Sequence, residues 1–451
     1  MKEERNRLTE GAIAGKLIRF AIPVFLGSVF QQLYNTADAL IVGRMLGSQA
    51  LAAVSATGVL VILLISLFSG ISTGAGVLVS KYYGARDDED VSKGIHTELA
   101  FDIVMGCLLT LIGIFLTPIF LRWMGTPEEI LPMSVLYLRV YYSGSICLVL
   151  YNGCWSIMQA LGDSRHPLYY LIFSSVLNVI LDYVFIRFFH GGVGSAALAT
   201  VIAQFISAVL CLVQLSRTGE YRVSLRKIRF TFPILKEMLS YGLPAGIQTT
   251  VTYFANVVAQ SFINSFGTMA IAGFGAYGRI EGFGFLPITC FAVSITTFVG
   301  QNLGAKKYDR ARAGAKIGII SCFCLSLLVG LFAFTFARQL IGAFVQDGEA
   351  IRFGVEKMRV SAFFWAVVSL SHTVAAVLRG SGRSVIPMIS MFFFWFILRL
   401  AILYVFMPIW HDIRILYWLY PITWVVSAVF LLFYFWRADW VHGFEKKGKL
   451  S

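Results

Sequence analysis

The segment Val59-Leu60-Val61-Ile62-Leu63-Leu64-Ile65 decides the fold class, because seven apolar residues follow one another without interruption. It belongs to an apolar run over residues 51–80, which exceeds the ~20 residues that a helix needs to cross the hydrocarbon core of a bilayer. A strand of a membrane barrel would instead alternate apolar and polar residues over ~10 positions. The run therefore predicts a helix that spans a membrane.

The rest of the chain has the same character. Hydrophobic residues make up 58% of the 451 residues, charged residues only 14%, and the mean hydropathy is +0.76, well outside the range of soluble domains. Twelve long apolar runs predict an all-α integral membrane protein. Their approximate extents are 19–42, 51–80, 95–120, 135–160, 167–189, 193–215, 238–264, 270–301, 313–337, 358–378, 385–409 and 415–436.

The sequence also repeats itself about 220 residues apart. Pro23 opens an apolar run that ends at Gly84-Ala85-Arg86, and Pro244 opens a matching run that ends at Gly304-Ala305-Lys306. A duplicated unit of this kind is the usual origin of a transporter whose two halves enclose one path. We therefore expect two pseudo-symmetric lobes of six transmembrane helices each, around a central cavity.

The polar interval between the two halves sets the predicted domain boundaries. It runs from residue 217 to residue 236 and holds six Lys and Arg residues. We expect an amino-terminal lobe over residues 1–216, a cytoplasmic linker over residues 217–236, and a carboxyl-terminal lobe over residues 237–451.

The net charge of +13 is explained by membrane topology rather than by nucleic-acid binding. If the amino terminus is cytoplasmic, 26 of the 37 Lys and Arg residues fall in the termini and the loops of that side. Such a bias follows the positive-inside rule. It predicts a multi-pass protein of the plasma or inner cell membrane, in contact with lipid, with both termini in the cytoplasm and no nucleic-acid partner.

Nothing in the chain suggests nucleotide or cofactor chemistry. There is no GxxxxGK[ST] phosphate-binding loop, and no soluble domain interrupts either half. The six histidines are scattered and form no cluster with cysteines or carboxylates, which argues against a membrane enzyme. We expect no nucleotide and no cofactor, and an ion gradient as the source of energy if the protein works against a gradient.

Ionisable groups inside the apolar runs are the main candidates for function, because each costs at least ~2.5 kcal/mol on insertion scales. The first run contains Asp38. The fifth contains Asn178 and Asp182, which are four residues apart and so share one helix face, and the sixth contains Thr200. If these faces converge, two carboxyl groups, an amide and a hydroxyl form a proton-binding or sodium-binding site. The alternative is that both aspartates are polar contacts between helices, or lie close enough to the membrane surface to be hydrated.

Other polar side chains in the runs are candidates for the substrate path. They occur in the first run, beside Asp38, and in three runs of the second half of the chain. The candidates are Tyr34, Asn35, Tyr253, Asn256, Gln260, Glu281 and Arg399.

The arrangement of these motifs resembles the multidrug and toxic compound extrusion (MATE) family over nearly the whole chain. Each piece is weak alone, but their order and spacing are specific. The pieces are residues 32–38 (QLYNTAD), 42–44 (VGR), 160–163 (ALGD) with Pro167, 178–182 (NVILD), 194–200 (GSAALAT) and 300–305 (GQNLGA).

The resemblance implies a secondary transporter that exports amphipathic, often cationic, small molecules or drugs by alternating access, in antiport with protons or sodium. Residues matching Asp38, Asn178, Asp182 and Thr200 form the coupling network in relatives with this pattern, so no metal other than sodium is expected there. Pro23 permits a bend in the first helix, and protonation of Asp38 is expected to change that bend. We expect a monomer.

One departure and one alternative remain. Some MATE members carry essential carboxylates in the seventh and tenth helices, whereas the runs 238–264 and 358–378 contain none.

The alternative function is a flippase for a lipid-linked precursor, which related folds perform. Such a protein would be expected to carry a markedly cationic central cavity, and Arg279 and Arg399 argue only mildly for one.

Overall fold

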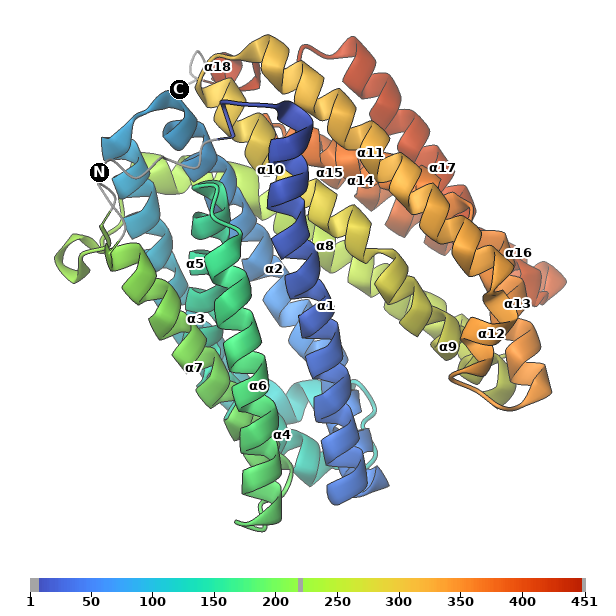
Figure 1. Ribbon diagram of the computed structural model, residues 1–451. Coiled ribbons are helices and arrows are strands. Elements are labelled where there is room, and N and C mark those ends of the chain that lie inside the picture. Colours follow the sequence, from blue (N-terminus) through green and yellow to red (C-terminus); the bar gives the residue numbers. More distant parts are fainter. Residues whose placement is uncertain (1–7, 218–221, 448–451) are drawn as a thin grey trace. The chain divides into compact units, whose positions relative to one another are not determined.

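The computed structural model describes residues 8–217 and 222–447, and the chain there is mainly helical (Figure 1). In lipid a helix satisfies every backbone N–H and C=O within its own segment, so long apolar runs adopt it. The elements of the first half are α1 (Ile13–Met45), α2 (Ser48–Ala85), α3 (Asp88–Trp123), α4 (Leu131–Ser143), α5 (Ser145–Ala160), α6 (Arg165–Arg187), α7 (Val193–Arg217) and η2 (Leu225–Lys227).

The second half repeats the pattern with more interruptions. Its elements are α8 (Phe232–Asn264), α9 (Thr268–Gly284), α10 (Leu286–Gly304), α11 (Tyr308–Thr335), α12 (Ala337–Gly342), α13 (Gly348–Ser361), α14 (Phe364–Gly380), α15 (Val385–Ser390), η3 (Met391–Ile397), α16 (Leu398–Trp410), α17 (Ile413–Arg437) and α18 (Gly443–Lys447).

These helices account for the twelve predicted crossings. Within the described part of the chain, nine segments are long and apolar enough to span a membrane, and two bent helix pairs raise the number to eleven. The twelfth is α8, which is 33 residues long but carries Gln248, Asn256 and Gln260 among its apolar residues. The predicted all-α membrane fold with six crossings in each half is confirmed.

The two bent pairs correspond to each other in the repeat. α4 and α5 meet at 52°, and α13 and α14 meet at 55°. The sequence predicted each as one uninterrupted run, over 135–160 and 358–378. In the first pair Gly144 stands at the break and caps α4, and its Cα lies so close to Val201 of α7 that a Cβ would overlap that side chain. The second crossing also begins earlier than predicted, because α13 starts at Gly348.

Positive backbone φ angles reveal the duplication in the backbone itself. Gly47 precedes α2 with φ 92° and Gly267 precedes α9 with φ 90°, a conformation that only glycine adopts readily. Three more pairs with positive φ stand 220 or 221 residues apart. They are Arg86 and Lys306, Gly162 and Gly382, and His190 and His411.

The chain forms two compact units whose boundaries differ from the predicted lobes. Unit 1 contains residues 22–246, and unit 2 contains the described residues up to Ala21 together with Ile247 and all that follows. The chain therefore passes between units inside α1 and again inside α8, rather than in the linker 217–236. Pro23 and Pro244 lie two residues from these two boundaries.

The segments that precede α1 and α8 also pack in the unit that is formed mostly by the other half of the sequence. The Leu8 backbone N–H, before α1, donates to Gln301 Oε1 on α10 in unit 2 (2.9 Å). The Ser224 backbone N–H, before α8, donates to His96 Nε2 on α3 in unit 1 (3.0 Å). Each half of the sequence thus begins in the unit formed mostly by the other half.

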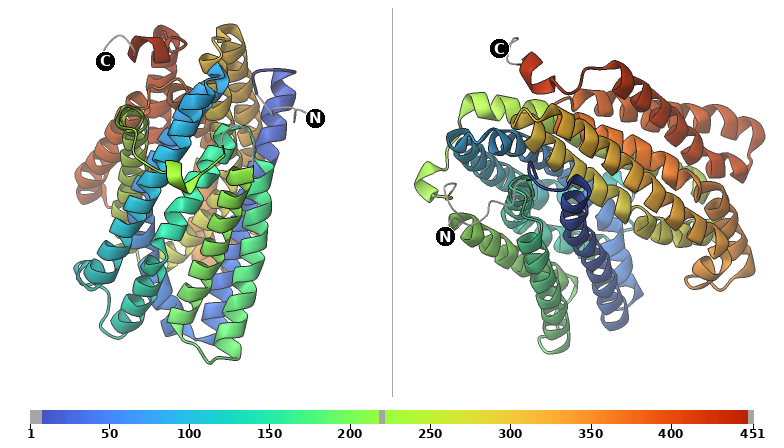
Figure 2. Two further views of the ribbon diagram at one scale, coloured as in Figure 1. Left: turned by 90° about the vertical axis from the view of Figure 1, so that its left-hand side faces the viewer. Right: turned by 45° about the horizontal axis from the view of Figure 1, so that its top comes forward.

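Within each unit the helices pack along their lengths. In unit 1, α6 and α7 form a hairpin of neighbouring helices, and α3 packs against α2, α4 and α5 (Figures 1 and 2). In unit 2, α14 packs against α10, α11 and α17, with Trp365 and Trp424 almost wholly buried in the core.

Candidate functional site

Three helices of unit 1 bring the predicted coupling residues together. Asp38 comes from α1, Asn178 and Asp182 from one face of α6, and Thr200 from α7. The three residues from α6 and α7 are buried: Asn178 is 1%, Asp182 0% and Thr200 6% exposed. The i, i+4 spacing on α6 and the hairpin between α6 and α7 place them at one level.

The Asn178 amide connects α6 with α7. We orient the amide by its hydrogen bonds: its nitrogen donates to Asp182 Oδ2 (3.0 Å), and its oxygen accepts from the Thr200 backbone N–H (3.1 Å) and hydroxyl (3.2 Å). The reverse orientation would turn the amide oxygen toward the Asp182 carboxylate. Asp182 is thus held by one donor, which leaves part of its hydrogen-bonding capacity open.

The two carboxyl groups face each other. Asp38 and Asp182 lie at hydrogen-bonding range, and Oδ1 of each accepts no hydrogen bond from the described residues. Two ionised carboxylates cannot donate to each other and repel strongly where water is scarce. The arrangement is therefore satisfied only when a proton or another cation lies between them.

Tyrosines surround this pair. The Tyr34 side chain, one turn before Asp38, lies at hydrogen-bonding range of Thr200. Tyr137 and Tyr141 of α4 stack on each other with ring centroids 6.2 Å apart, and Tyr141 lies at hydrogen-bonding range of Gln204 on α7. Tyr34 was predicted from the sequence, whereas the α4 tyrosines were not, although their one-turn spacing could have indicated them. Asn35, on the neighbouring position of α1, is exposed.

The candidates of the second half are divided between one buried cluster and the surface. Arg399 of α16 is 0% exposed. Its Nη1 donates to Asn256 Oδ1 on α8 (2.7 Å) and its Nη2 to Thr423 Oγ1 on α17 (3.2 Å). The guanidinium also lies 4.4 Å from the centre of the Tyr420 ring, an attractive geometry for a cation.

A buried lysine that was not predicted from the sequence lies in the same unit. Lys357 of α13 is 1% exposed and donates to the backbone carbonyls of Leu416 and Tyr417, both at 3.1 Å. Glu281 of α9 accepts a hydrogen bond from Tyr277 (2.6 Å). The predicted tenth run began at residue 358, one position too late to include the lysine.

Two other path candidates are not part of this cluster. The Tyr253 side chain is 41% exposed. Gln260 is exposed and donates to Asn264 Oδ1 one turn further along α8 (2.9 Å).

Two further carboxylates of unit 1 were not predicted from the sequence. Glu98 and Asp102 of α3 are both 0% exposed. They lie within the predicted run 95–120 at the same i, i+4 spacing as Asn178 and Asp182, so the filter applied to the other runs would have found them.

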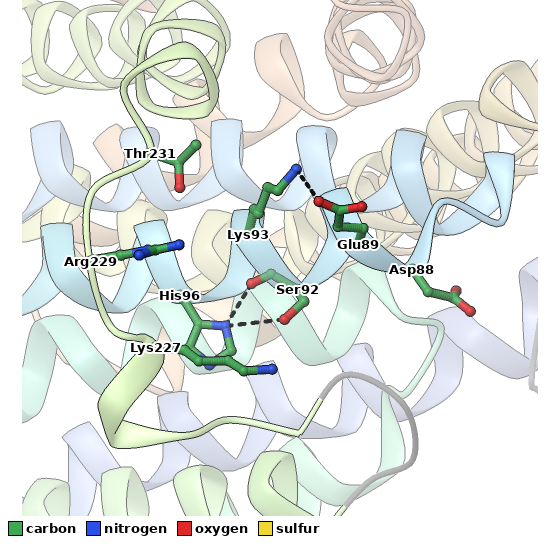
Figure 3. A pocket seen from close by; sticks show the side chains of 8 residues that line it. All are labelled: Asp88, Glu89, Ser92, Lys93, His96, Lys227, Arg229 and Thr231. Atoms are coloured by element: carbon green, nitrogen blue, oxygen red, sulfur yellow. Dashed lines mark hydrogen bonds and ion pairs between the residues drawn. The ribbon is translucent and has the colours of Figure 1, made fainter.

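A surface pocket lies where the linker meets α3, and it differs from these buried sites. It is lined by Asp88, Glu89, Ser92, Lys93, His96, Lys227, Arg229 and Thr231, and Figure 3 shows the α3 side chains beside the linker residues. Its charges of both signs include the Lys93–Glu89 ion pair (2.8 Å). His96 Nδ1 bonds the Ser92 carbonyl (2.7 Å), and its Nε2 receives the Ser224 N–H. We interpret the pocket as the docking place of the linker.

Comparison with known proteins agrees with the fold. The chain is 28% identical to a probable multidrug resistance protein, YoeA, of Bacillus subtilis, over 83% of each chain. It is 26% identical to a second B. subtilis protein, the probable multidrug resistance protein YpnP, over 86% of this chain and 87% of that one. A structure of the outward-facing conformation of a multidrug resistance MATE family transporter superposes with a TM-score of 0.90 at 24% identity, covering 99% of this chain and 100% of that chain.

The family model for MatE matches twice, over residues 23–184 and over residues 244–405. The two matches begin at Pro23 and Pro244 and stand 221 residues apart at both ends, so they coincide with the repeat in sequence and in backbone. The chain therefore belongs to the MatE family, the multidrug and toxic compound extrusion transporters that its sequence resembles.

Proposed function

We propose that the protein is a cation-coupled efflux transporter, which exports amphipathic, often cationic, drugs or other small molecules by alternating access. The coupling cation, a proton or sodium, binds at Asp38, Asn178, Asp182 and Thr200. The multidrug resistance relatives support the export of drugs. The protein works as a monomer in the cell membrane, with both termini in the cytoplasm.

The pair of facing carboxyl groups is the observation that carries this proposal. Asp38 and Asp182 lack a basic partner, since the described residues form no ion pair with either. A carboxyl pair without a base attracts a cation from solution, and its affinity falls when that cation is released to one side. Such a site binds and releases one cation per cycle without any cofactor.

Coupling requires that cation binding change the conformation of the unit. Asp38 lies on α1, whereas Asp182 and Thr200 lie on the α6–α7 hairpin, so a shared proton draws α1 toward that hairpin. Pro23, fifteen residues before Asp38, lacks an N–H and leaves the carbonyl of Arg19 without its helical hydrogen bond. The helix can therefore bend there when the attraction at Asp38 is gained or lost.

The substrate contacts apolar and aromatic side chains together with the remaining polar candidates. Asn35, Tyr253 and Gln260 are the exposed path candidates, and Tyr34 is half-buried. Aromatic faces attract organic cations, and such walls tolerate many substrate shapes. Asn256, Glu281 and Arg399 support the path from inside the unit, because their side chains are engaged with neighbours.

The deciding experiment is the efflux of a fluorescent cationic dye in everted membrane vesicles containing the full chain. A proton gradient and a sodium gradient are imposed separately at fixed starting pH, with wild type, Asp38→Asn and the exposed control Glu89→Gln. We expect one gradient to drive dye movement in wild type and in the control, and neither to do so in Asp38→Asn. Export by Asp38→Asn equal to that of wild type would sink the coupling proposal.

The second candidate function is a flippase for a lipid-linked precursor, and few features of the structure support it. A headgroup of a lipid-linked precursor is anionic and needs available cations, but Arg399 and Lys357 already donate to groups of their own unit. Absence of dye movement under both gradients, together with transbilayer movement of a lipid-linked precursor in proteoliposomes, would favour the flippase.

A further inference from the structure

Glu98 and Asp102 form a buried acidic pair on α3 that the proposed coupling site does not use. Both side chains are 0% exposed, and they lie one turn apart on the same face of the helix. All four carboxylate oxygens are without a hydrogen-bond donor among the described residues. Buried polar groups are normally hydrogen-bonded, so four open oxygens indicate a ligand that is not part of the chain.

The surroundings of the pair are closely packed. α5 approaches α3 at Gly153, where a Cβ would overlap the Asp102 carboxyl group. Ile95 and Leu99 of α3 and the Cys154 thiol of α5 belong to the buried core around it. Ser72 of α2 lies beside Glu98, but its hydroxyl donates to the Phe68 carbonyl (3.3 Å).

None of the helices packed on α3 supplies a base to the pair. On α2, Lys81 pairs with Glu237 (2.6 Å), and Tyr82 donates to the same carboxylate. On α4, Arg139 Nε donates to the Ile114 carbonyl (3.0 Å), and the Tyr142 hydroxyl donates to the Leu60 carbonyl (3.4 Å). The titratable groups of α5 at this level are Tyr151 and Cys154, which carry no positive charge.

The basic residues of α3 itself point elsewhere. Lys93 is paired with Glu89 and Asp90. His96 bonds the linker, and two residues of helix turn it about 200° away from Glu98. Both acids are thus fully buried, and no described Lys, Arg or His residue forms an ion pair with either of them.

We propose that Glu98 and Asp102 form a second proton-binding site, separate from the cluster of Asp38, Asn178, Asp182 and Thr200. One carboxyl group keeps its proton at neutral pH, which removes the repulsion that two buried charges one turn apart would create. A proton fits better than a metal ion, because the described residues offer no group of three or more His, Cys, Asp and Glu side chains that could hold one. Proton binding can be measured without transport, so the inference stands or falls apart from the proposed function.

The test measures the infrared carbonyl band of protonated carboxyl groups in the purified full-length protein at neutral pH. Exposed carboxyl groups are ionised there and do not contribute to the band. The Asp38→Asn, Asp182→Asn double variant serves as background, which removes the other pair. In this background, Glu98→Gln with Asp102→Asn is compared with Glu89→Gln, an acid of the same helix whose side chain is 80% exposed.

We expect the Glu98→Gln, Asp102→Asn change to remove the signal of one protonated carboxyl group per chain, and Glu89→Gln to remove none. An unchanged band in the former variant would overturn the proposal. So would loss of the band on addition of sodium at constant pH with release of one proton, because the ligand would then be sodium. If the combined variant does not fold, the single variants Glu98→Gln and Asp102→Asn provide the same readout, and one of them must lose the band.

Discussion

The two units carry buried charges of opposite sign. Among the described Asp, Glu, Lys, Arg and His residues, the buried ones are Glu98, Asp102, Asp182 and His96 in unit 1 and Lys357 and Arg399 in unit 2. The bases of unit 2 are satisfied by carbonyl, amide and hydroxyl oxygens of their own unit. The acids of unit 1 lack basic partners. Among the described residues, the buried bases of unit 2 thus have partners within their unit, whereas the buried acids of unit 1 have no basic partner.

The largest effect is expected where the missing cation binds. Asp182→Asn removes one of the two facing carboxyl groups, so Asp38 no longer faces a second carboxylate and the repulsion that a bound cation would relieve is gone. We expect a near-complete loss of gradient-driven dye export, with binding of dye to the purified protein retained. Everted-vesicle transport and equilibrium dye binding check this, and full export by the variant would remove Asp182 from the coupling site.

A change in the basic cluster should affect folding instead. Arg399→Leu leaves the Asn256 and Thr423 oxygens without their donor inside the unit, and each buried acceptor left unsatisfied costs about 1–3 kcal/mol. Thermal unfolding in detergent is the measurement, and Arg414→Leu, at an exposed arginine of α17, is the control. Equal thermal stability of Arg399→Leu and Arg414→Leu would show that the hydrogen bonds of Arg399 do not stabilise the fold.

The backbone should behave alike in both units even though the charges do not. Gly47→Ala and Gly267→Ala place a side chain at φ near 90°, which costs about 1–3 kcal/mol, and neither Cβ would meet another atom. We expect similar losses of thermal stability. Gly275→Ala, inside α9 and equally free of contacts, should be neutral or stabilising. Markedly unequal losses of thermal stability at Gly47 and Gly267 would contradict the symmetry inferred from the backbone.

The smallest effect is expected at the edge of the cation site. Tyr34→Phe removes the hydroxyl beside Thr200, and one such hydrogen bond contributes about 0.5–1.5 kcal/mol. The apparent affinity for the coupling cation should change less than about tenfold, since 1.4 kcal/mol corresponds to a factor of ten. Cation-concentration curves of dye export measure it, and abolished coupling would make Tyr34 a fifth essential residue.

The sequence predicted the helical fold because lipid leaves few alternatives. A long apolar run becomes a helix whatever its neighbours are, so the twelve crossings followed from composition alone. The bends at Gly144 and between α13 and α14 did not follow, because they depend on how closely other helices approach. The passage of the chain between units within α1 and α8 also leaves no local trace, apart from the nearby Pro23 and Pro244.

The candidate site was predictable where spacing was informative. Asn178 and Asp182 share a face by their positions alone, Asp38 and Thr200 were found as polar side chains within apolar runs, and the family resemblance joined the four in one network. The same rule applied to α3 would have identified Glu98 and Asp102. The contact of Arg399 with Asn256, 143 residues apart in the chain, depends on tertiary packing, which one sequence does not reveal.

The exchange of helix beginnings between units bears on the origin of the molecule. The first turns of α1 complete unit 2, and those of α8 complete unit 1. A single ancestral half would therefore have lacked a piece of its own core and carried a surplus piece. Two copies correct both defects when each contributes the first turns of its first helix to the other, as in a domain-swapped dimer. In this chain both copies are covalently linked, so each unit contains the helix beginning that it needs.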